Sequence, residues 1–226
     1  MRLDLLAALN AARAERRAAA VVTEMPGGAQ RVVTEAAGDP LAGPLAKAFA
    51  SGRSCMIDAG ERSAFINVHL PATRLVILGA VHVGQTLAPI AAALDYDVTV
   101  VDPRTAFATA ERFSGVSLVA DWPDRALPEM RLDRYTAFAA LTHDPKIDDP
   151  GLIEALRAGC FYVGALGSRK THAARRERLL AAGLAEAEID RIKAPIGLAI
   201  GAASPAEIAI SIMAEITAEL RRPVAA

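Results

Sequence analysis

From Arg74 onward, continuous apolar runs alternate with segments of helical character, and this alternation restricts the fold more than any other feature of the sequence. The run LVILG at 75–79 contains no polar residue, which is typical of a strand covered on both faces of a parallel sheet. Strands that alternate with helices predict βαβ units and a doubly wound, Rossmann-like parallel sheet. The other expected strands are 97–102, 117–120, 135–143 and 160–168, and the expected helices are about 82–94, about 149–158, a helix from near Ser168 and about 205–221.

The segment before this alternation has a different pattern, which predicts a small α+β unit. A helix is expected over about 2–18, followed by a hairpin of two β-rich runs around a Pro-Gly-Gly turn at 26–28. A second helix over 41–51 and two more strands around a turn at Gly60 complete the segment. The predicted fold class is therefore α/β, with a small α+β N-terminal unit at 1–71 and a Rossmann-like domain at 72–226.

Charge and composition exclude several classes of function. The formal net charge is −1 and aromatic residues make up 4% of the chain, which argues against nucleic acid and anionic membrane surfaces as partners. The first 20 residues combine helical apolar spacing with several charges, so an amphipathic surface helix is expected rather than a targeting signal, and no run is long enough to span a membrane. The two cysteines, Cys55 and Cys160, have no metal-ligand spacing, and they favour a reducing, cytoplasmic location.

The turn from Gly79 to Gly84, after the first strand of the alternation, is the first candidate binding site. A dinucleotide-binding turn has the pattern GxGxxG, whose second glycine lets a pyrophosphate approach the backbone. Gly79 and Gly84 occupy the first and third positions, but Val81 occupies the second. Asp102 ends the next strand, where a ribose-binding carboxylate would lie, and Arg104 follows it. Either the turn borders a phosphate-bearing ligand, or it is only a tight connection with Arg104 solvated.

The second candidate is Thr142-His143-Asp144-Pro145-Lys146, which directly follows the apolar run YTAFAAL. Ligands of open parallel sheets bind beyond the carboxyl ends of the strands. His143 at this place can donate a hydrogen bond or exchange a proton near neutral pH. The alternative is a structural role, in which His143 and Asp144 cap the following helix and Pro145 fixes the turn.

The third candidate is the glycine-containing turn Gly164-Ala165-Leu166-Gly167-Ser168-Arg169-Lys170-Thr171 between a strand and a helix. Glycine permits close backbone approach, Ser168 suits a helix N-cap, and the two basic residues add positive charge where a phosphate would sit. The turn resembles an anion cradle without the spacing of a Walker loop, and an ordinary capped helix is the alternative. The following arginines are expected on a solvated or partner-facing surface: Arg175, Arg176 and Arg178.

The remaining candidates have mainly structural interpretations. Two glycines in the apolar segment 194–207 suggest a wall over the cleft, with Glu207 either binding a polar ligand or favouring the N-terminus of the last helix. Cys160 and Cys55 are expected to pack, although a role in carrying sulfur is the alternative for Cys160. The sequence shows no motif for a catalytic residue, and none for a metal ligand.

The runs LVILGAVHVG, VVDPR, LTHDPKIDDP, YVGALGSRKTHAARRERL and PIGLAIGAASPAEIAISIMAEI, in this order, resemble the XdhC/CoxI family. These are accessory proteins in the maturation of xanthine dehydrogenase and carbon monoxide dehydrogenase, and the resemblance covers about residues 72–222. It implies a chaperone that binds the molybdenum cofactor (molybdopterin), protects it and assists its sulfuration and its insertion into the target enzyme. By resemblance, the residues bordering the cofactor are Gly79, His82, Gly84, Asp102, Arg104, His143, Asp144, Gly167, Ser168 and Arg169.

The resemblance also implies partners, and the residues leave two other functions open. The implied partners are an acceptor molybdoenzyme of the xanthine dehydrogenase type, a cysteine desulfurase and a second copy of the chain in a homodimer. The first alternative is an NAD(P)-dependent oxidoreductase with His143 as proton donor and Arg104 or Lys170 near a phosphate. The second is a regulatory or scaffolding module with an empty cleft. An accessory protein is expected rather than a catalyst.

Overall fold

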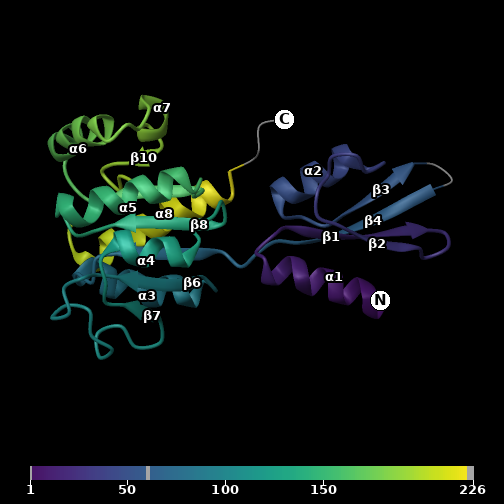
Figure 1. Ribbon diagram of the computed structural model, residues 1–226, viewed down its shortest axis with the longest axis horizontal. Coiled ribbons are helices and arrows are strands. Elements are labelled where there is room, and N and C mark those ends of the chain that lie inside the picture. Colours follow the sequence, from purple (N-terminus) through teal and green to yellow (C-terminus); the bar gives the residue numbers. More distant parts are fainter. Residues whose placement is uncertain (1, 60–61, 223–226) are drawn as a thin grey trace. The chain divides into compact units, whose positions relative to one another are not determined.

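The computed structural model describes residues 2–59 and 62–222 and divides the chain into two compact units, with the boundary between Ala72 and Thr73 (Figure 1). The turn expected at Gly60 lies outside the described residues. No helix within the described ranges is long and apolar enough to cross a lipid bilayer.

The first unit is a four-stranded antiparallel sheet with a helix on each face. Along β1, Ala20 and Val22 pack with Leu45 of α2, whereas Ala19 and Val21 pack with Leu9 of α1. This division follows from the alternation of side chains along a strand. The strands run in the order β2-β1-β4-β3. The elements are α1 Leu3–Ala14, β1 Ala19–Met25, β2 Gln30–Val33, α2 Ala42–Ser51, β3 Cys55–Ala59 and β4 Arg62–His69.

The second unit confirms the predicted α/β class, because its six strands form one parallel sheet in the order β10-β9-β8-β5-β6-β7. After β7 the chain crosses back to place β8 beside β5, so the direction of winding changes between β5 and β8. The strands are β5 Arg74–Leu78, β6 Asp97–Val101, β7 Ser117–Val119, β8 Thr136–Ala140, β9 Tyr162–Ala165 and β10 Ile192–Lys193. The helices are α3 His82–Ala93, α4 Pro123–Met130, α5 Pro145–Arg157, α6 Arg169–Ala181, α7 Glu186–Ile189 and α8 Pro205–Leu220.

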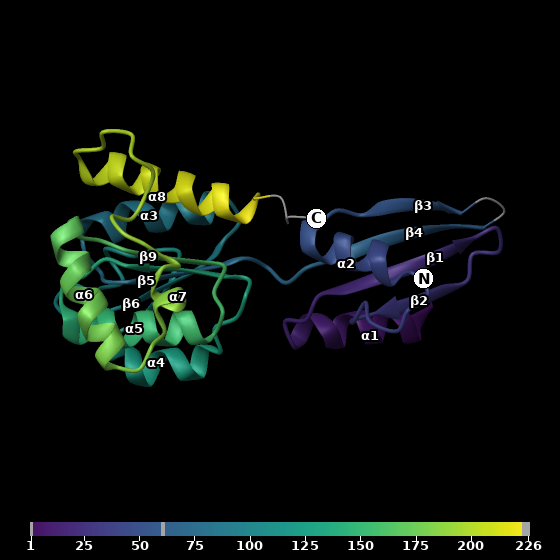
Figure 2. The ribbon, with the colours of Figure 1, turned by 90° about the horizontal axis from the view of Figure 1, so that it is seen from above.

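Helices cover both faces of this sheet, as Figure 2 shows with α3 and α8 on one side and α4 and α5 on the other. The central strand β5 supplies side chains to both cores: Leu75 and Ile77 pack toward α3 and α8, and Val76 and Leu78 pack toward α4 and α5. All four are at most 1% exposed. Burial on both faces explains why the sequence of this strand is continuously apolar.

Several element boundaries differ from the sequence-based expectation. Helix α5 begins at Pro145 instead of about 149, because the Asp144 side chain accepts a hydrogen bond from the Lys146 amide and Pro145 needs no amide partner in the first turn. Helix α1 ends at Ala14 instead of about 18, and Arg16 just beyond it has a positive φ of 53°. The sequence reading did not include α4, α7 or β10.

Candidate functional site

The carboxyl ends of β9, β8, β5 and β6 meet at one edge of the sheet, because these four parallel strands are neighbours. Each strand leads into a loop that carries sequence-predicted site residues. The structure therefore brings together the turn at Gly79, the loop after Asp102, the loop at His143 and the turn at Gly167. This edge is the place where open parallel sheets bind ligands.

The β5–α3 turn is kept tight by Gly79 and Gly84. Gly79 has a φ of +121°, and a Cβ atom there would lie 2.8 Å from the Thr142 Cγ2. A Cβ atom on Gly84 would lie 2.6 Å from the Gly79 carbonyl oxygen, so this residue serves close packing of α3 against the turn. Val81 is the N-cap of α3 and gives its first turn no side-chain hydrogen bond, which leaves the amides next to the exposed His82 suited to an anion.

Asp102 and Arg104 form a clamp at the end of β6. The Arg104 guanidinium donates to both oxygens of the fully buried Asp102 carboxylate, at 2.9 and 2.8 Å, and the Ala80 amide donates to Oδ2 at 2.7 Å. Burial raises the pKa of Asp102, but these hydrogen bonds outweigh it, so that the pKa lies below its ordinary value. The carboxylate is thus occupied within the protein, and a ribose would have to displace Arg104 to reach it.

Arg112, which sequence reasoning missed, ties the loop after β6 to the β5–α3 turn. Its Nη1 donates to the carbonyl oxygens of Ala80 at 2.9 Å and Phe107 at 2.8 Å. Its Nε and Nη2 donate to the Gln85 side chain at 3.3 and 3.2 Å. Because its partners at 80 and 85 lie far away in the sequence, no local pattern marks this arginine.

The β8–α5 loop presents His143 at the edge. His143 is exposed and has a φ of +63°, a left-handed conformation that is uncommon for residues other than glycine. Asp144 caps α5, as the structural alternative for this residue predicted. Asp148, in the first turn of α5, accepts hydrogen bonds from the Thr142 amide at 3.3 Å, the Thr142 hydroxyl at 2.7 Å and the His143 amide at 3.1 Å. Asp148 is not among the site residues predicted from the sequence.

At the β9–α6 turn, Ser168 caps α6 by accepting a hydrogen bond from the Thr171 amide at 3.2 Å. The side chains of Arg169 and Lys170 are exposed and have no ion-pair partner among the residues that the structure describes. The prediction of a surface position for Arg175 is wrong, because this side chain is only 2% exposed. Its spacing of four residues from the buried Leu179 was the signal that could have placed it on the inner face of α6.

The segment 194–207 is anchored to α8 by polar contacts. Glu215 accepts a hydrogen bond from the buried Tyr162 hydroxyl at 2.6 Å and another from the Gly197 amide at 2.9 Å. Glu207 forms a capping box with Ser204 and accepts hydrogen bonds from the Ala203 and Ser204 amides, both at 2.8 Å. Glu207 therefore stabilises the N-terminus of α8, as its structural interpretation predicted.

The two cysteines differ in exposure, and neither has a disulfide partner. Cys160 is fully buried, and this burial raises the pKa of its thiol to about 12. A thiol with such a pKa is protonated at neutral pH and is a poor nucleophile. Cys55 is half-buried on β3 of the first unit.

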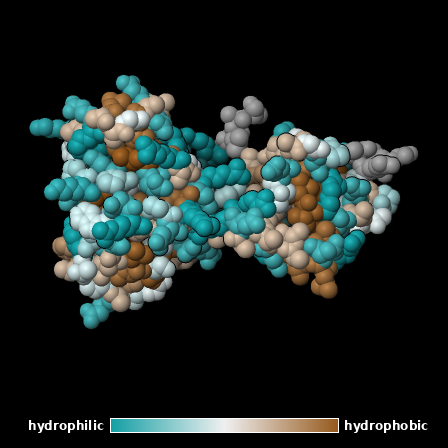
Figure 3. All heavy atoms as spheres, in the orientation of Figure 1, coloured by the Kyte–Doolittle hydropathy of each residue, from teal (hydrophilic) through white to brown (hydrophobic). Residues whose placement is uncertain are grey.

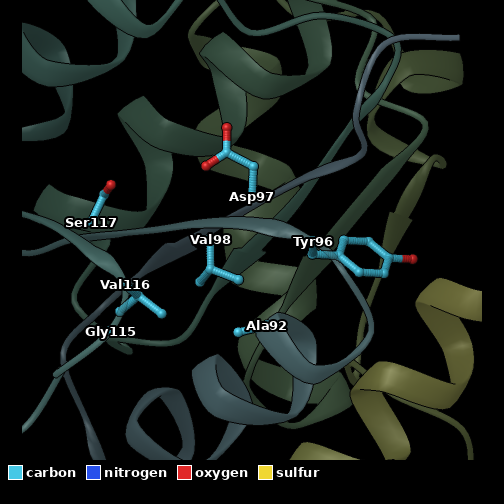
Figure 4. A pocket seen from close by; sticks show the side chains of 7 residues that line it. All are labelled: Ala92, Tyr96, Asp97, Val98, Gly115, Val116 and Ser117. Atoms are coloured by element: carbon cyan, nitrogen blue, oxygen red, sulfur yellow. The ribbon is translucent and has the colours of Figure 1, made fainter.

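Surface hollows also occur away from the strand-end edge. One hollow, of about 320 Å³, is lined by Tyr96, Asp97, Gly115 and Ser117 among others and lies where β6 and β7 begin (Figure 4). This is the opposite end of the strands from His143 and Arg104. On the face in Figure 3, apolar areas lie among hydrophilic residues. Three large apolar side chains in and just before α8 are exposed: Leu198, Ile200 and Ile210.

Taken together, the strand-end edge offers hydrogen-bond donors and positive charge. Its carboxylates accept hydrogen bonds within the protein: Asp102 from Arg104, Asp144 from the Lys146 amide, and Asp148 from the β8–α5 loop. Arg169 and Lys170 remain exposed at the start of α6. An arrangement of this kind suits an anionic group such as a phosphate.

Comparisons with known proteins agree with the fold and identify a family and several relatives. The family described as the XdhC Rossmann domain matches residues 75–216. The sequence is 33% identical over 146 residues to the molybdenum cofactor insertion chaperone PaoD of Escherichia coli (strain K12), covering 65% of this chain and 40% of that protein. It is 32% identical over 159 residues to a probable xanthine dehydrogenase subunit of Bacillus subtilis (strain 168), covering 70% of this chain and 46% of that protein.

A solved structure supports the architecture over nearly the whole chain. A structure described as a xanthine dehydrogenase from Bacillus halodurans aligns with a TM-score of 0.69 at 23% identity, covering 96% of this chain and 63% of that one. This likeness concerns the fold. The chain spans less than half the length of the curated relatives it matches.

Proposed function

The chain belongs to the XdhC family, and from this premise we propose that it binds the molybdenum cofactor and assists its insertion into a xanthine dehydrogenase-type enzyme. The name of the relative PaoD, a molybdenum cofactor insertion chaperone, supports the cofactor, and the relative named as a xanthine dehydrogenase subunit supports the acceptor class. A cysteine desulfurase as further partner and a homodimer as the working form stay predictions from the sequence.

The observation that carries the proposal is the imbalance of charge at the strand-end edge. Its carboxylates are hydrogen-bonded within the protein, whereas Arg169 and Lys170 are exposed and the first turn of α3 has no side-chain cap. Molybdopterin ends in a phosphate, which such a set of donors can hold. The residues present therefore fit the phosphate end of the cofactor.

The roles of the residues follow from this fit. The amides at the start of α3 and α6, with Arg169 and Lys170, would hold the phosphate, and His143 would offer a hydrogen bond from the β8–α5 loop. When bound in its acceptor enzyme, the cofactor supplies the molybdenum centre of that enzyme's redox chemistry. This chain needs only to bind, shield and release it. Arg104 is already bound to Asp102, so it would set the shape of the turn.

An NAD(P)-dependent oxidoreductase is the rival function, and one observation weighs against it. A dinucleotide fold normally offers a carboxylate after the second strand to the ribose hydroxyls. Here that carboxylate belongs to Asp102, which is fully buried and bound to Arg104 and the Ala80 amide. Saturable nicotinamide binding would restore this rival.

The test is cofactor content after anaerobic purification from a host that makes molybdenum cofactor. Molybdenum and oxidised-pterin fluorescence per chain would be measured for the wild type and for Arg169→Ala/Lys170→Ala. Arg176→Ala is the matched control, because Arg176 lies on the same helix and pairs with Asp190. We expect near-stoichiometric pterin in the wild type and the control, and at least a tenfold loss in the double variant.

Other outcomes would reject the proposal or its site. Released nucleotide without pterin would favour the oxidoreductase, and neither ligand would favour a scaffolding module. Equal pterin in all three proteins would leave cofactor binding standing and move the site away from the β9–α6 turn.

A further inference from the structure

Two Asp–Arg pairs join α5 to α6, and they differ in their surroundings. The outer pair is Asp149–Arg178, in which Arg178 Nη2 donates to Asp149 Oδ1 at 3.1 Å and the arginine side chain is 39% exposed. The inner pair is Asp148–Arg175, whose Nη2 and Oδ2 atoms lie 3.9 Å apart with the two side chains 1% and 2% exposed. The outer pair has the character of a surface ion pair, and the inner pair lies beneath the strand-end edge.

Each member of the inner pair holds one of the two loops that flank the proposed cofactor site. Asp148 uses Oδ1 for the hydroxyl and amide of Thr142 and Oδ2 for the amide of His143. Arg175 donates through Nη2 to the Leu166 carbonyl oxygen at 3.0 Å, immediately before the Gly167 turn. The pair therefore links the β8–α5 loop to the β9–α6 turn.

This link acts where the backbone is strained. His143 has a φ of +63°, and a non-glycine residue in this region is held there only when its surroundings offset the strain. The hydrogen bond from its amide to Asp148 Oδ2 at 3.1 Å supplies such an anchor. The imidazole is exposed at the edge while the backbone beneath it is fixed.

The inner pair is an energetically unfavourable contact between α5 and α6. The Nε and Nη1 atoms of Arg175 are buried without a hydrogen-bond partner within the described ranges, and so is Nδ1 of His172, one turn earlier on α6. Buried charges with unmet donors destabilise a fold, and apolar side chains of similar size often replace such pairs without loss of stability. Stability alone therefore does not explain the arrangement.

We propose that Asp148 and Arg175 are positioning residues, which fix the spacing between His143 and the Gly167–Ser168 turn so that both face the same bound cofactor. The inference deepens the proposed function and depends on it for the identity of the ligand. Neither side chain needs to touch the ligand, because each acts through backbone groups of a loop: the Thr142 and His143 amides, and the Leu166 carbonyl.

The first test needs no ligand and measures hydrogen–deuterium exchange in the full-length chain. Asp148→Asn keeps the size of the side chain but has one oxygen where Asp148 uses two. We expect amide exchange in 141–147 to rise at least tenfold in Asp148→Asn. In Asp149→Asn, the matched control on the outer pair, exchange in this segment should stay within twofold of the wild type.

A second arm separates positioning from general stabilisation. Glycine adopts a positive φ without strain, so the loop of His143→Gly needs less anchoring. Adding Asp148→Asn to His143→Gly should therefore raise exchange in 141–147 less than threefold. An equal rise in both backgrounds would show that Asp148 only stabilises the fold and would overturn the inference. If Asp148→Asn does not fold, Thr142→Val removes a single hydroxyl donor and should raise exchange in the same segment.

The third arm uses molybdenum cofactor released anaerobically from a purified molybdoenzyme as the probe. We expect its Kd to rise at least tenfold in Asp148→Asn and in Arg175→Met, and to stay within twofold in Asp149→Asn and Arg178→Met. An unchanged Kd in the inner-pair variants would overturn the inference even if the wild type binds tightly. A wild type that binds no cofactor would refute the proposed function instead. The exchange experiments would then still test whether Asp148 holds the backbone of His143 in place.

Discussion

The Arg104 guanidinium donates two hydrogen bonds, of 2.9 and 2.8 Å, to the buried Asp102 carboxylate. This pair lies where a dinucleotide-binding fold has a carboxylate that is free to bind the ribose. The Ala80 amide joins the same carboxylate at 2.7 Å, so the end of β6 is fixed to the β5–α3 turn. Asp102 therefore holds the strand-end edge together, and its protonation state should affect stability.

Asp102→Asn should lower the free energy of unfolding at pH 7 by about 2–3 kcal/mol, because it removes a buried charge that Arg104 and two amides satisfy. The pKa of Asp102 is lowered in the folded chain, so its contribution is present above the unfolded value of about 3.9 and is lost as pH falls through the folded pKa. Urea unfolding followed by circular dichroism from pH 7 to pH 2 measures this. The stability difference between wild type and variant should shrink below about pH 4. If the difference in unfolding free energy stayed constant over this pH range, the Asp102 carboxylate would not be the source of the pH dependence. Glu111→Gln, at an exposed position, is the control.

Gly79→Ala should destabilise the chain by about 2–4 kcal/mol, because it combines a positive φ with a steric clash. The new Cβ atom would lie 2.8 Å from the Thr142 Cγ2, at a φ of +121°. Gly115→Ala is the matched control: it has a φ of +82° and nothing within 4 Å, so only about 1–2 kcal/mol is expected. Denaturant unfolding compares the two. Thr142→Ser added to Gly79→Ala should recover part of the loss, and no recovery would show that the clash is not with this methyl group.

Arg112→Ala should loosen the loop between β6 and β7, because one guanidinium donates to the Ala80 and Phe107 carbonyl oxygens and to Gln85. We expect limited proteolysis within 103–116 to be faster by about tenfold, which corresponds to a loss of about 1.4 kcal/mol in local stability. Arg125→Ala, which removes a 73% exposed arginine, is the control and should leave the cleavage rate unchanged. If both variants were cleaved at the wild-type rate, Arg112 would not be the residue that anchors this loop.

The Rossmann-like sheet was predictable because its central strands are buried on both faces, which leaves long apolar runs such as LVILG. Helix α4 was not predicted because it has only eight residues and contains Pro128, a residue type that normally interrupts helices. The short α7 and β10 are equally weak as local signals, since they contain only four and two residues. Their formation depends on packing against the rest of the sheet.

The loops that form the site could be predicted from the sequence, but the side-chain contacts between them could not. Glycines and polar residues after the strands pointed to the edge where Gly79, His143 and Gly167 meet. The sequence did not show that Asp148 and Arg175 are buried, because a charged residue in a helix is normally exposed. Such contacts join residues 27 positions apart, and only the packing of α5 against α6 brings them together.

Cys160 should be unreactive in the folded chain, since burial raises the pKa of its thiol to about 12. In a Cys55→Ser background, iodoacetamide at pH 8 should modify less than about a tenth of Cys160 in the time that labels it fully in urea, because only the accessible thiolate reacts. Cys160→Ala retains Cys55, which is half-buried, as the comparison thiol. Mass spectrometry of the intact chain gives both extents. Rapid native labelling of Cys160, or a persulfide found on it after purification, would contradict this expectation and support a role for Cys160 in carrying sulfur.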